Sequence, residues 1–387
     1  MPKIAVVEIL AVRHFVTELC KIAQAGNNEV VLFSTPRIYE KLAPEMSSLS
    51  IQVVLALKGE SQLHFLRRIG GEISCGGFDH CIINTYRAWQ FLFFRPRIKK
   101  IVRKFNLNWM FKDTTLVGYL KGLTNAEALK LKDPTRNAVT GPILRRLMLR
   151  SVDAVLVEYP PFVDYVKAAW GSRPPAYFLP LTCFEAQSRP ESRRDPERIT
   201  FAVPGIVTEL RRDYDLVLDA FEVLYERHGA QVELILLGSA DSDSIVARCE
   251  ELARRGFSIK YYREDFVALE TYDAGLRDAD VLIAPLKLDF RYREVRETYT
   301  VSKGSGFFAD SLKFGKPCVV PQTSQLPDEY QDAFLRYGTK EELIGILTSL
   351  VTNSESMDKI KAAALDLYGK LTPENLGARL NQVLSST

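Results

Sequence analysis

The first half of the chain alternates short apolar runs with longer amphipathic stretches. Runs rich in β-branched and other apolar residues predict buried strands at 3–8, 29–34, 51–57, 80–84, 109–112 and 154–157. The stretches between them predict helices, among others at 14–24, 91–105 and 143–150. Strands that alternate with helices of about 10–15 residues are typical of a parallel sheet with helices on both faces.

The alternation stops near residue 185 and starts again at residue 199. Residues 186–198 are polar and contain two prolines, which predicts a linker. The second half predicts strands at 199–203, 232–237, 258–262, 281–285 and 318–321, and helices at 214–227, 245–255, before Asp278, at 307–314 and from Lys340 onward. We therefore expect an N-terminal domain over residues 1–185 and a C-terminal domain over residues 199–387, whose last helices are candidates for packing back on the first domain.

Two doubly wound α/β domains in series are the fold class that this pattern predicts. In open α/β sheets, ligands bind at the carboxyl ends of the strands. Two such domains facing each other place the natural site in the cleft between them. The pattern alone fits a transferase, a dehydrogenase, an epimerase or a binding protein.

The 387-residue chain has a formal net charge of only +3, but the charge is divided unevenly. Residues 1–190 hold 26 Lys and Arg against 15 Asp and Glu, a net +11, and the rest holds 25 against 33, a net −8. The first half is therefore suited to an anionic partner. The segment from Arg87 to Lys104 joins aromatic residues to seven basic ones, which favours an anionic membrane surface or a phosphorylated acceptor. A helix with a solvated basic face is the alternative, and no RNA-binding motif is visible, so no nucleic-acid partner is expected.

The six cysteines are scattered, with no CxxC pair and no zinc-site spacing, so we expect reduced thiols and a cytoplasmic setting. The N-terminus has the pattern of a first strand, not of a signal peptide. No apolar run approaches the roughly 18–20 residues of a membrane span. Asp241 and Asp243 have the spacing of a metal-binding pair, but they lie at a helix start, where capping accounts for them. We expect no metal and no other cofactor.

The most informative stretch covers residues 301–320. Gly304, Ser305 and Gly306 let a ligand approach the backbone at the start of a helix, whose unpaired N–H groups and dipole suit a diphosphate. Lys303 adds a full positive charge beside them. Asp310 lies one helical turn past Gly306 on the same face, where its carboxylate suits the hydroxyls of a ribose. A plain Gly-rich turn with a solvated Asp310 is the alternative.

Residues 310–317, Asp-Ser-Leu-Lys-Phe-Gly-Lys-Pro, resemble the pattern E-A-x-x-x-G-x-P of GT-B glycosyltransferases. The resemblance implies two Rossmann-like domains facing each other across a cleft. It also implies that Asp310 holds the ribose of a nucleotide-sugar donor and that the start of its helix receives the diphosphate. The family often has another Glu eight residues earlier, where this chain has Ser302. The resemblance therefore leaves open whether transfer retains or inverts the configuration of the sugar.

Two further stretches resemble the same family. Residues 199–221 resemble its unit of strand, glycine, basic residue and helix, which implies that Gly205 and Arg212 contact the donor diphosphate. Residues 278–286 resemble its A-D-x-x-x-x-P strand, and the turn at 261–265, which contains Arg263, lies where the family holds the nucleotide base. Solvated arginines at a helix start and an ordinary buried strand with its polar turn are the alternatives.

GT-B enzymes often place a His at the start of the first helix, so the resemblance implies His14 as a catalytic base. Asp113, just after a predicted strand, is the other candidate. A helix cap at His14 and a solvated carboxylate at Asp113 are the alternatives. We expect a hexosyltransferase that moves a sugar from a UDP- or GDP-linked donor to a hydroxyl acceptor, such as a glycan or a lipid-linked or polysaccharide precursor, on or near the cytoplasmic face of a membrane. A UDP-sugar epimerase of the same fold and a non-catalytic nucleotide-sugar-binding subunit are the alternative functions.

Overall fold

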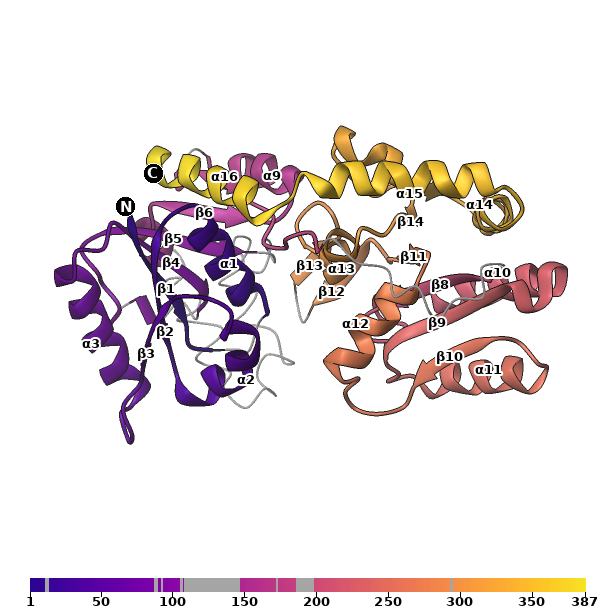
Figure 1. Ribbon diagram of the computed structural model, residues 1–387, viewed down its shortest axis with the longest axis horizontal. Helices are drawn as coiled ribbons and strands as arrows, with labels where there is room; N and C mark the ends of the chain where they lie inside the picture. The colour runs from indigo at the N-terminus through magenta and orange to yellow at the C-terminus, as the bar shows by residue number, and fades with distance from the viewer. Residues whose placement is uncertain are drawn as a thin grey trace, which may run out of the picture.

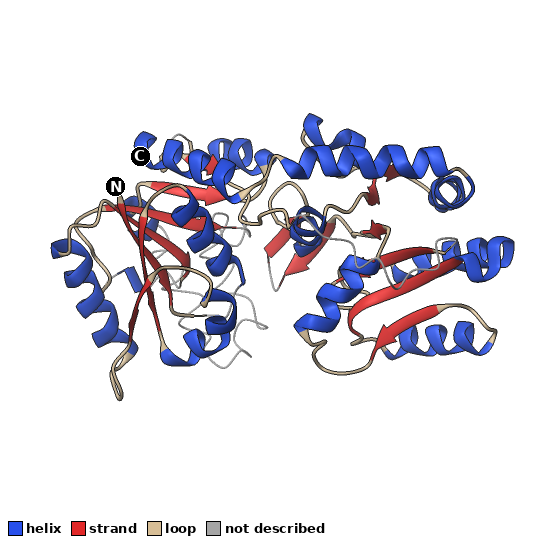
Figure 2. Cartoon of the chain, in the orientation of Figure 1, coloured by secondary structure: helices blue, strands red, loops and turns tan. Residues whose placement is uncertain are grey.

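The computed structural model describes residues 1–10, 14–86, 90, 91, 93–104, 107, 147–171, 173–185, 198–292 and 295–387. In this part of the chain, two parallel β-sheets with their helices stand side by side (Figure 1). Figure 2 shows the same view with helices and strands distinguished, and both halves have the strand core and helical cover of an α/β domain.

Within the described residues, the first sheet has seven parallel strands in the order β3-β2-β1-β4-β5-β6-β7. These strands are β1 (Lys3–Glu8), β2 (Glu29–Ser34), β3 (Gln52–Leu55), β4 (His80–Thr85), β5 (Lys99–Lys104), β6 (Ala154–Val157) and β7 (Ala176–Phe178). Among the described residues of this half, the helices with both ends defined are α1 (His14–Ala25), α2 (Pro36–Met46), α3 (Gln62–Cys75) and α9 (Pro160–Trp170). The strand order reverses between β1 and β4, and such a switch point opens a crevice at the carboxyl ends of the strands.

The second sheet, built from described residues after 198, has six parallel strands in the order β10-β9-β8-β11-β14-β15. They are β8 (Ile199–Pro204), β9 (Val232–Ser239), β10 (Ile259–Tyr262), β11 (Val281–Ile283), β14 (Cys318–Pro321) and β15 (Phe334–Tyr337). The helices are α10 (Tyr214–His228), α11 (Asp243–Arg254), α12 (Leu269–Asp278) and α13 (Gly306–Phe314), with 3₁₀ turns η3 (Gly229–Gln231) and η4 (Asp328–Ala333). An antiparallel hairpin of β12 (Asp289–Tyr292) and β13 (Val295–Thr298) is inserted between β11 and α13. The switch point here lies between β8 and β11.

The C-terminal helices connect the two halves. Helices α14 (Lys340–Thr352), α15 (Ser354–Gly369) and α16 (Pro373–Ser386) run from the second sheet back to the first, as the yellow ribbon in Figure 1 shows. Helix α16 packs on α1 where two glycines touch, since a Cβ on Gly377 would lie 2.7 Å from the Cα of Gly26. The Asn381 amide donates to the Gly26 carbonyl at 2.8 Å. The last helix of the chain therefore packs against the half of the molecule that contains the N-terminus.

The predicted fold class is confirmed, because both halves are Rossmann-like parallel sheets. The strand predicted at 109–112, most of the helix predicted at 143–150 and residues 186–197 of the predicted linker lie outside the described residues. The helix predicted over 91–105 is wrong, because residues 99–104 form β5 in the interior of the first sheet. Pro96 cannot supply a helical N–H, and the fully buried Ile101 and Val102 pack well in a strand covered on both faces.

Candidate active site

A cavity of about 270 Å³ lies between the carboxyl edges of the two sheets. The second half supplies most of its wall, from the loop after β8, from α12 and from the segment that leads into α13. The first half supplies Phe15 on α1, Arg103 in β5 and Glu158 directly after β6. The lining residues therefore come from the edge where parallel α/β sheets bind their ligands.

The structure brings most of the predicted donor-binding residues together at this cavity. Its lining includes seven of the eight, namely Gly205, Arg212, Lys303, Gly304, Ser305, Gly306 and Asp310. Arg263 is not among the lining residues. Its side chain is exposed after β10 and forms an ion pair with Glu250 on α11.

The start of α13 faces the cavity. Ser305 precedes the helix in an extended conformation, its side chain makes no capping hydrogen bond, and the first turn contains no acidic residue. The cavity is open directly at the first helical residue, because a Cβ on Gly306 would meet no other atom within 4 Å. The N–H groups and the positive dipole end of α13 are therefore available to an anion.

Cationic side chains surround this helix start. Gly205 has a φ of +90°, which favours glycine, and a Cβ there would lie 2.7 Å from the Arg212 guanidinium. Arg212 Nη1 donates to the Ile206 carbonyl at 2.8 Å, which holds the guanidinium against the loop after β8. Lys303 is nearly buried, with its ammonium 5.8 Å from the centre of the Tyr299 ring. Arg211, which sequence reasoning did not select, also lines the cavity.

Asp310 is the carboxylate on this side of the cavity. It is half-buried, and its Oδ2 accepts a hydrogen bond from the Tyr272 hydroxyl at 2.7 Å. Burial raises the pKa of Asp310 to about 6, although the Tyr272 hydrogen bond and the positive charge of Arg212 act in the opposite direction. At neutral pH the side chain is therefore still ionised and can accept hydrogen bonds from hydroxyl groups.

Ser302 does not line the cavity. It is fully buried, its hydroxyl donates to Glu297 Oε2 at 2.7 Å, and its Oγ accepts from the Thr298 N–H at 3.0 Å. Its carbonyl accepts from the N–H of Leu107, in the first half of the chain, at 2.7 Å. The serine at this motif position therefore stabilises the turn that presents Lys303.

A buried polar network lies on the opposite side of the cleft, and sequence reasoning missed it. Glu8 ends β1 and accepts from the Asn84 amide at 2.6 Å, and Asn84 Oδ1 in turn accepts from Arg103 Nη1 at 3.0 Å. Arg103 forms an ion pair with Glu158 and lies 4.3 Å from the centre of the Phe15 ring. Each of these polar residues lies at or near the carboxyl end of a strand. A polar residue at the end of an apolar run is therefore the sequence signal that could have identified them.

The two predicted catalytic residues lie largely outside the described part of the chain. His14 is the first residue of α1, and the next residue, Phe15, lines the cavity, but the His14 side chain is not described. Asp113 lies wholly outside the described residues. Their roles stay predictions.

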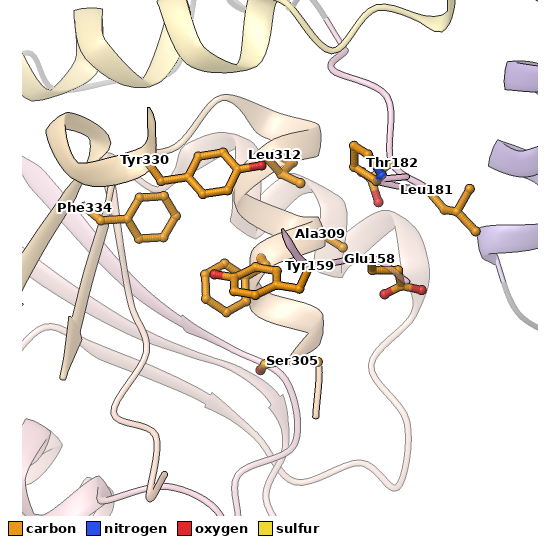
Figure 3. Close-up of a pocket in the computed structure, with 12 residues that line it drawn as sticks. Glu158, Tyr159, Leu181, Thr182, Ser305, Ala309, Leu312, Tyr330 and Phe334 are labelled. Atoms are coloured by element: carbon orange, nitrogen blue, oxygen red, sulfur yellow. The ribbon is translucent and has the colours of Figure 1, made fainter. Parts of the chain in front are cut away.

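A second, smaller cavity of about 30 Å³ adjoins the first and shares Glu158, Gly304 and Ser305 with it (Figure 3). Aromatic rings of both halves line it, with the ring centres of Tyr159 and Phe308 4.5 Å apart. The buried Tyr159 hydroxyl has no hydrogen-bond partner among the described residues, and a cavity of this size holds one water molecule. The aromatic contact joins the two halves directly beside the start of α13.

In the described part of the basic segment from Arg87 to Lys104, basic side chains lie both at the surface and in the interior. Arg95, Arg97 and Lys99 are exposed, whereas Arg103 is buried in the network described above. Among the described helices, none combines the length and the apolar character needed to cross a membrane. The described residues also contain no cluster of three or more His, Cys, Asp or Glu side chains suited to a metal ion.

A scan against protein-family models finds no match, and a sequence search for curated relatives finds none either. Solved structures, in contrast, match over the whole chain. Anabaena HepE in complex with UDP aligns with a TM-score of 0.61 at 13% identity, covering 100% of both chains. WaaG, a glycosyltransferase involved in lipopolysaccharide biosynthesis, aligns with a TM-score of 0.58 at 9% identity, covering 99% of this chain and 100% of that one. A candidate UDP-N-acetylglucosamine 2-epimerase from Listeria monocytogenes aligns with a TM-score of 0.56 at 13% identity, covering 99% and 95%.

The two parallel sheets and the cleft between them therefore define a two-domain protein of Rossmann-like architecture. More particularly, this chain has the GT-B fold of glycosyltransferases. Since sequence identity is this low, the likeness shows the fold, and the reaction has to be argued from the chemistry of the cleft.

Proposed function

We propose that this protein is a glycosyltransferase that moves a sugar from a nucleotide-sugar donor to a hydroxyl acceptor. The observation that carries the proposal is the composition of the cleft. The open start of α13, Arg212 and Lys303 converge on one cavity, and Asp310 lies one helical turn further along. A diphosphate at the helix start places its ribose within reach of the Asp310 carboxylate.

Each of these groups has a part in the proposed chemistry. Transfer requires a leaving diphosphate whose negative charge is stabilised, and fixed cations and helix N–H groups do this in a cleft that excludes water. Because the side-chain cations neutralise the diphosphate, we propose that no metal ion is required. Deprotonation of the acceptor hydroxyl is assigned to His14 or Asp113 in the first half.

We propose a uridine-linked donor and a cytoplasmic, membrane-associated setting. The Anabaena HepE structures contain UDP and UDP-glucose, so a UDP-linked donor is the first choice and a GDP-linked donor the second. The acceptor is a glycan or a lipid-linked or polysaccharide precursor. The exposed Arg95, Arg97 and Lys99 suit an anionic membrane surface, and the five buried, unpaired cysteines suit a reducing, cytoplasmic compartment.

Calorimetry with UDP, GDP and their sugar conjugates tests the donor site, and release of free nucleotide in the presence of acceptors tests transfer. Gly306→Ala makes the binding test specific. Its methyl group enters open space in the free protein, and alanine is the better helix former, so folding stability is kept or rises by up to about 1 kcal/mol. In the complex, the methyl group occupies the approach to the backbone, and we expect donor affinity to fall at least about tenfold.

Gly345→Ala is the matched control, since Gly345 also lies in a helix with open space at its Cβ position but is not a cavity residue. It should leave donor affinity unchanged. If Gly306→Ala binds the donor as tightly as the wild type, the diphosphate does not lie at the start of α13 and the proposed site is wrong.

A UDP-sugar epimerase is the second candidate, because a candidate enzyme of that class is among the similar structures. Incubation with donor alone separates the two reactions, since an epimerase changes the sugar without an acceptor. A non-catalytic nucleotide-sugar-binding subunit would bind the donor and would neither transfer nor hydrolyse it.

A further inference from the structure

Glu158 is the acidic residue that the first half contributes to the lining of the cleft. It follows β6 directly and borders both the large and the small cavity, together with Gly304 and Ser305 at the start of α13. In Figure 3 the Glu158 carboxylate lies beside α13 and points away from the ring of Tyr159. Its side chain is 20% exposed and lines the large cavity, and because Oε1 is buried, Oε2 is the oxygen left for a ligand.

Arg103 holds this carboxylate in place. The Arg103 side chain is only 1% exposed, and it is fixed by the Glu158 ion pair, by Asn84 and by the Phe15 ring. Asn84 is fixed in turn by the buried Glu8. Arg103 borders the cavity, but with 1% of its side chain exposed it presents little surface to a ligand, so its effect on one passes chiefly through the position of Glu158.

We infer that Glu158 binds a hydroxyl group of the sugar that is transferred, and that Arg103 is its positioning residue. This inference rests on the proposed function. With the diphosphate at the start of α13, the sugar on its far phosphate extends into the space that Glu158 borders. The adjacent guanidinium favours the ionised carboxylate, which accepts hydrogen bonds from hydroxyls and repels phosphate.

The alternatives are less consistent with the contacts. Glu158 is held in an ion pair with the buried Arg103, and taking up a proton would break that pair, so Glu158 is poorly suited to deprotonating the acceptor. Ser302, at the motif position where GT-B enzymes often carry a Glu, is enclosed by Glu297 and Thr298 and does not line the cavity. Among the lining residues of the large cavity, the carboxylates are Asp310 and Glu158, and Glu158 also shares the small cavity with Gly304 and Ser305 at the helix start.

The test compares a nucleotide with its sugar conjugates in one binding assay. The probes are UDP, UDP-glucose, UDP-galactose and UDP-N-acetylglucosamine, or GDP and GDP-mannose if the wild type binds that series. Both Glu158→Gln and Glu158→Ala remove the negative charge, but glutamine keeps the shape and an oxygen that accepts from Arg103, whereas alanine would also leave the buried guanidinium without that acceptor. We expect Glu158→Gln to raise the Kd of the preferred nucleotide sugar about tenfold or more and to change the Kd of the free nucleotide less than about twofold.

Arg103→Lys should reproduce part of this loss for the nucleotide sugar, again with little effect on the free nucleotide, because lysine keeps the charge but not the planar fork. Glu29→Gln is the control, since Glu29 is a half-exposed carboxylate at the opposite, amino edge of the same sheet. Glu29→Gln should leave the Kd of the nucleotide and the Kd of the nucleotide sugar unchanged. Thermal melts of each variant establish that it is folded.

Three results would overturn the inference. They are an equal loss of affinity for nucleotide and nucleotide sugar, no loss for either, and an unchanged donor Kd with a raised KM for the acceptor. Failure of the proposed function looks different. Without a donor site, the wild type itself would bind none of the nucleotides or nucleotide sugars, and an epimerase or a binding subunit would bind them without transferring the sugar to an acceptor.

Discussion

Asp310→Asn should make the protein more stable at neutral pH and at the same time weaken its donor site. Asparagine keeps the size of the side chain and an oxygen that accepts from Tyr272, but it cannot ionise. The pKa of Asp310 rises from an ordinary 3.8 to about 6 in the folded protein, chiefly because the carboxyl group is buried. The substitution removes the cost of burying that charge.

The size of the effect follows from the pKa difference, which corresponds to about 3 kcal/mol. Because the side chain is only half-buried, solvent screening reduces this, and we expect about 1–2 kcal/mol. The sign depends on pH. Between roughly pH 4 and pH 6 the folded state binds more protons than the unfolded state, so the wild type loses stability as the pH rises through this range and stays less stable above it.

The assay is a thermal melt of wild type and variant at pH 5 and pH 7.5. For a domain of this size, 1–2 kcal/mol raises the Tm by about 2–8 °C. This gain should appear at pH 7.5 and shrink at pH 5, where much of the wild-type Asp310 is protonated. Asp366→Asn is the control, since Asp366 is an exposed carboxylate paired with Lys370, and its Tm should not change at either pH.

Calorimetry on the same variant should show donor affinity reduced about tenfold or more, because a charge-assisted hydrogen bond to the ribose is lost. For the same reason, the wild type should bind the donor more weakly as the pH falls below about 6. If the Tm of Asp310→Asn at pH 7.5 is equal to or lower than that of the wild type, burial of the charge is not what raises the pKa of Asp310.

Four other results are expected. Lys303→Ala should raise the donor Kd at least about tenfold without unfolding the protein, as measured by calorimetry; unchanged affinity would mean that the segment is only structural. His14→Ala should lower turnover roughly 100-fold or more while donor binding persists, and near-normal turnover would move the role of base to Asp113. Activity should survive EDTA, and activity that vanishes and returns with magnesium or manganese would disprove metal independence. Co-sedimentation with anionic vesicles should exceed that with neutral vesicles and fall with salt, since surface charges are screened over about 8–10 Å near physiological ionic strength; equal binding to both would count against a role for Arg87–Lys104.

Local patterns in the sequence were enough to predict much of the second half. The strand predicted at 199–203 is β8 (Ile199–Pro204), and the helix predicted at 307–314 is α13 (Gly306–Phe314). Lys303, Gly304, Ser305, Gly306 and Asp310 lie within one loop and one helical turn, so their proximity follows from local geometry, whereas Gly205 and Arg212 join them only through the arrangement of the strands. Arg263 shows the limit of this reasoning, because nothing local indicated that it would pair with Glu250 and not face the cleft.

The side of the cleft formed by the first half of the chain could not be predicted in this way. Glu8, Asn84, Arg103 and Glu158 come from four strands that are far apart in sequence, and only the strand order places β1, β4, β5 and β6 next to one another. The helix wrongly predicted over residues 91–105 hid the same network, because in a helix Arg103 belongs to a basic stretch and not to the end of a buried strand. The periodicity of hydrophobic residues and the residues that favour a helix start involve only a few neighbouring positions. Strands, helices and helix-start sites can therefore be predicted from the sequence itself. Which strand ends meet depends on how segments tens of residues apart pack together, and that packing is decided only in the tertiary structure.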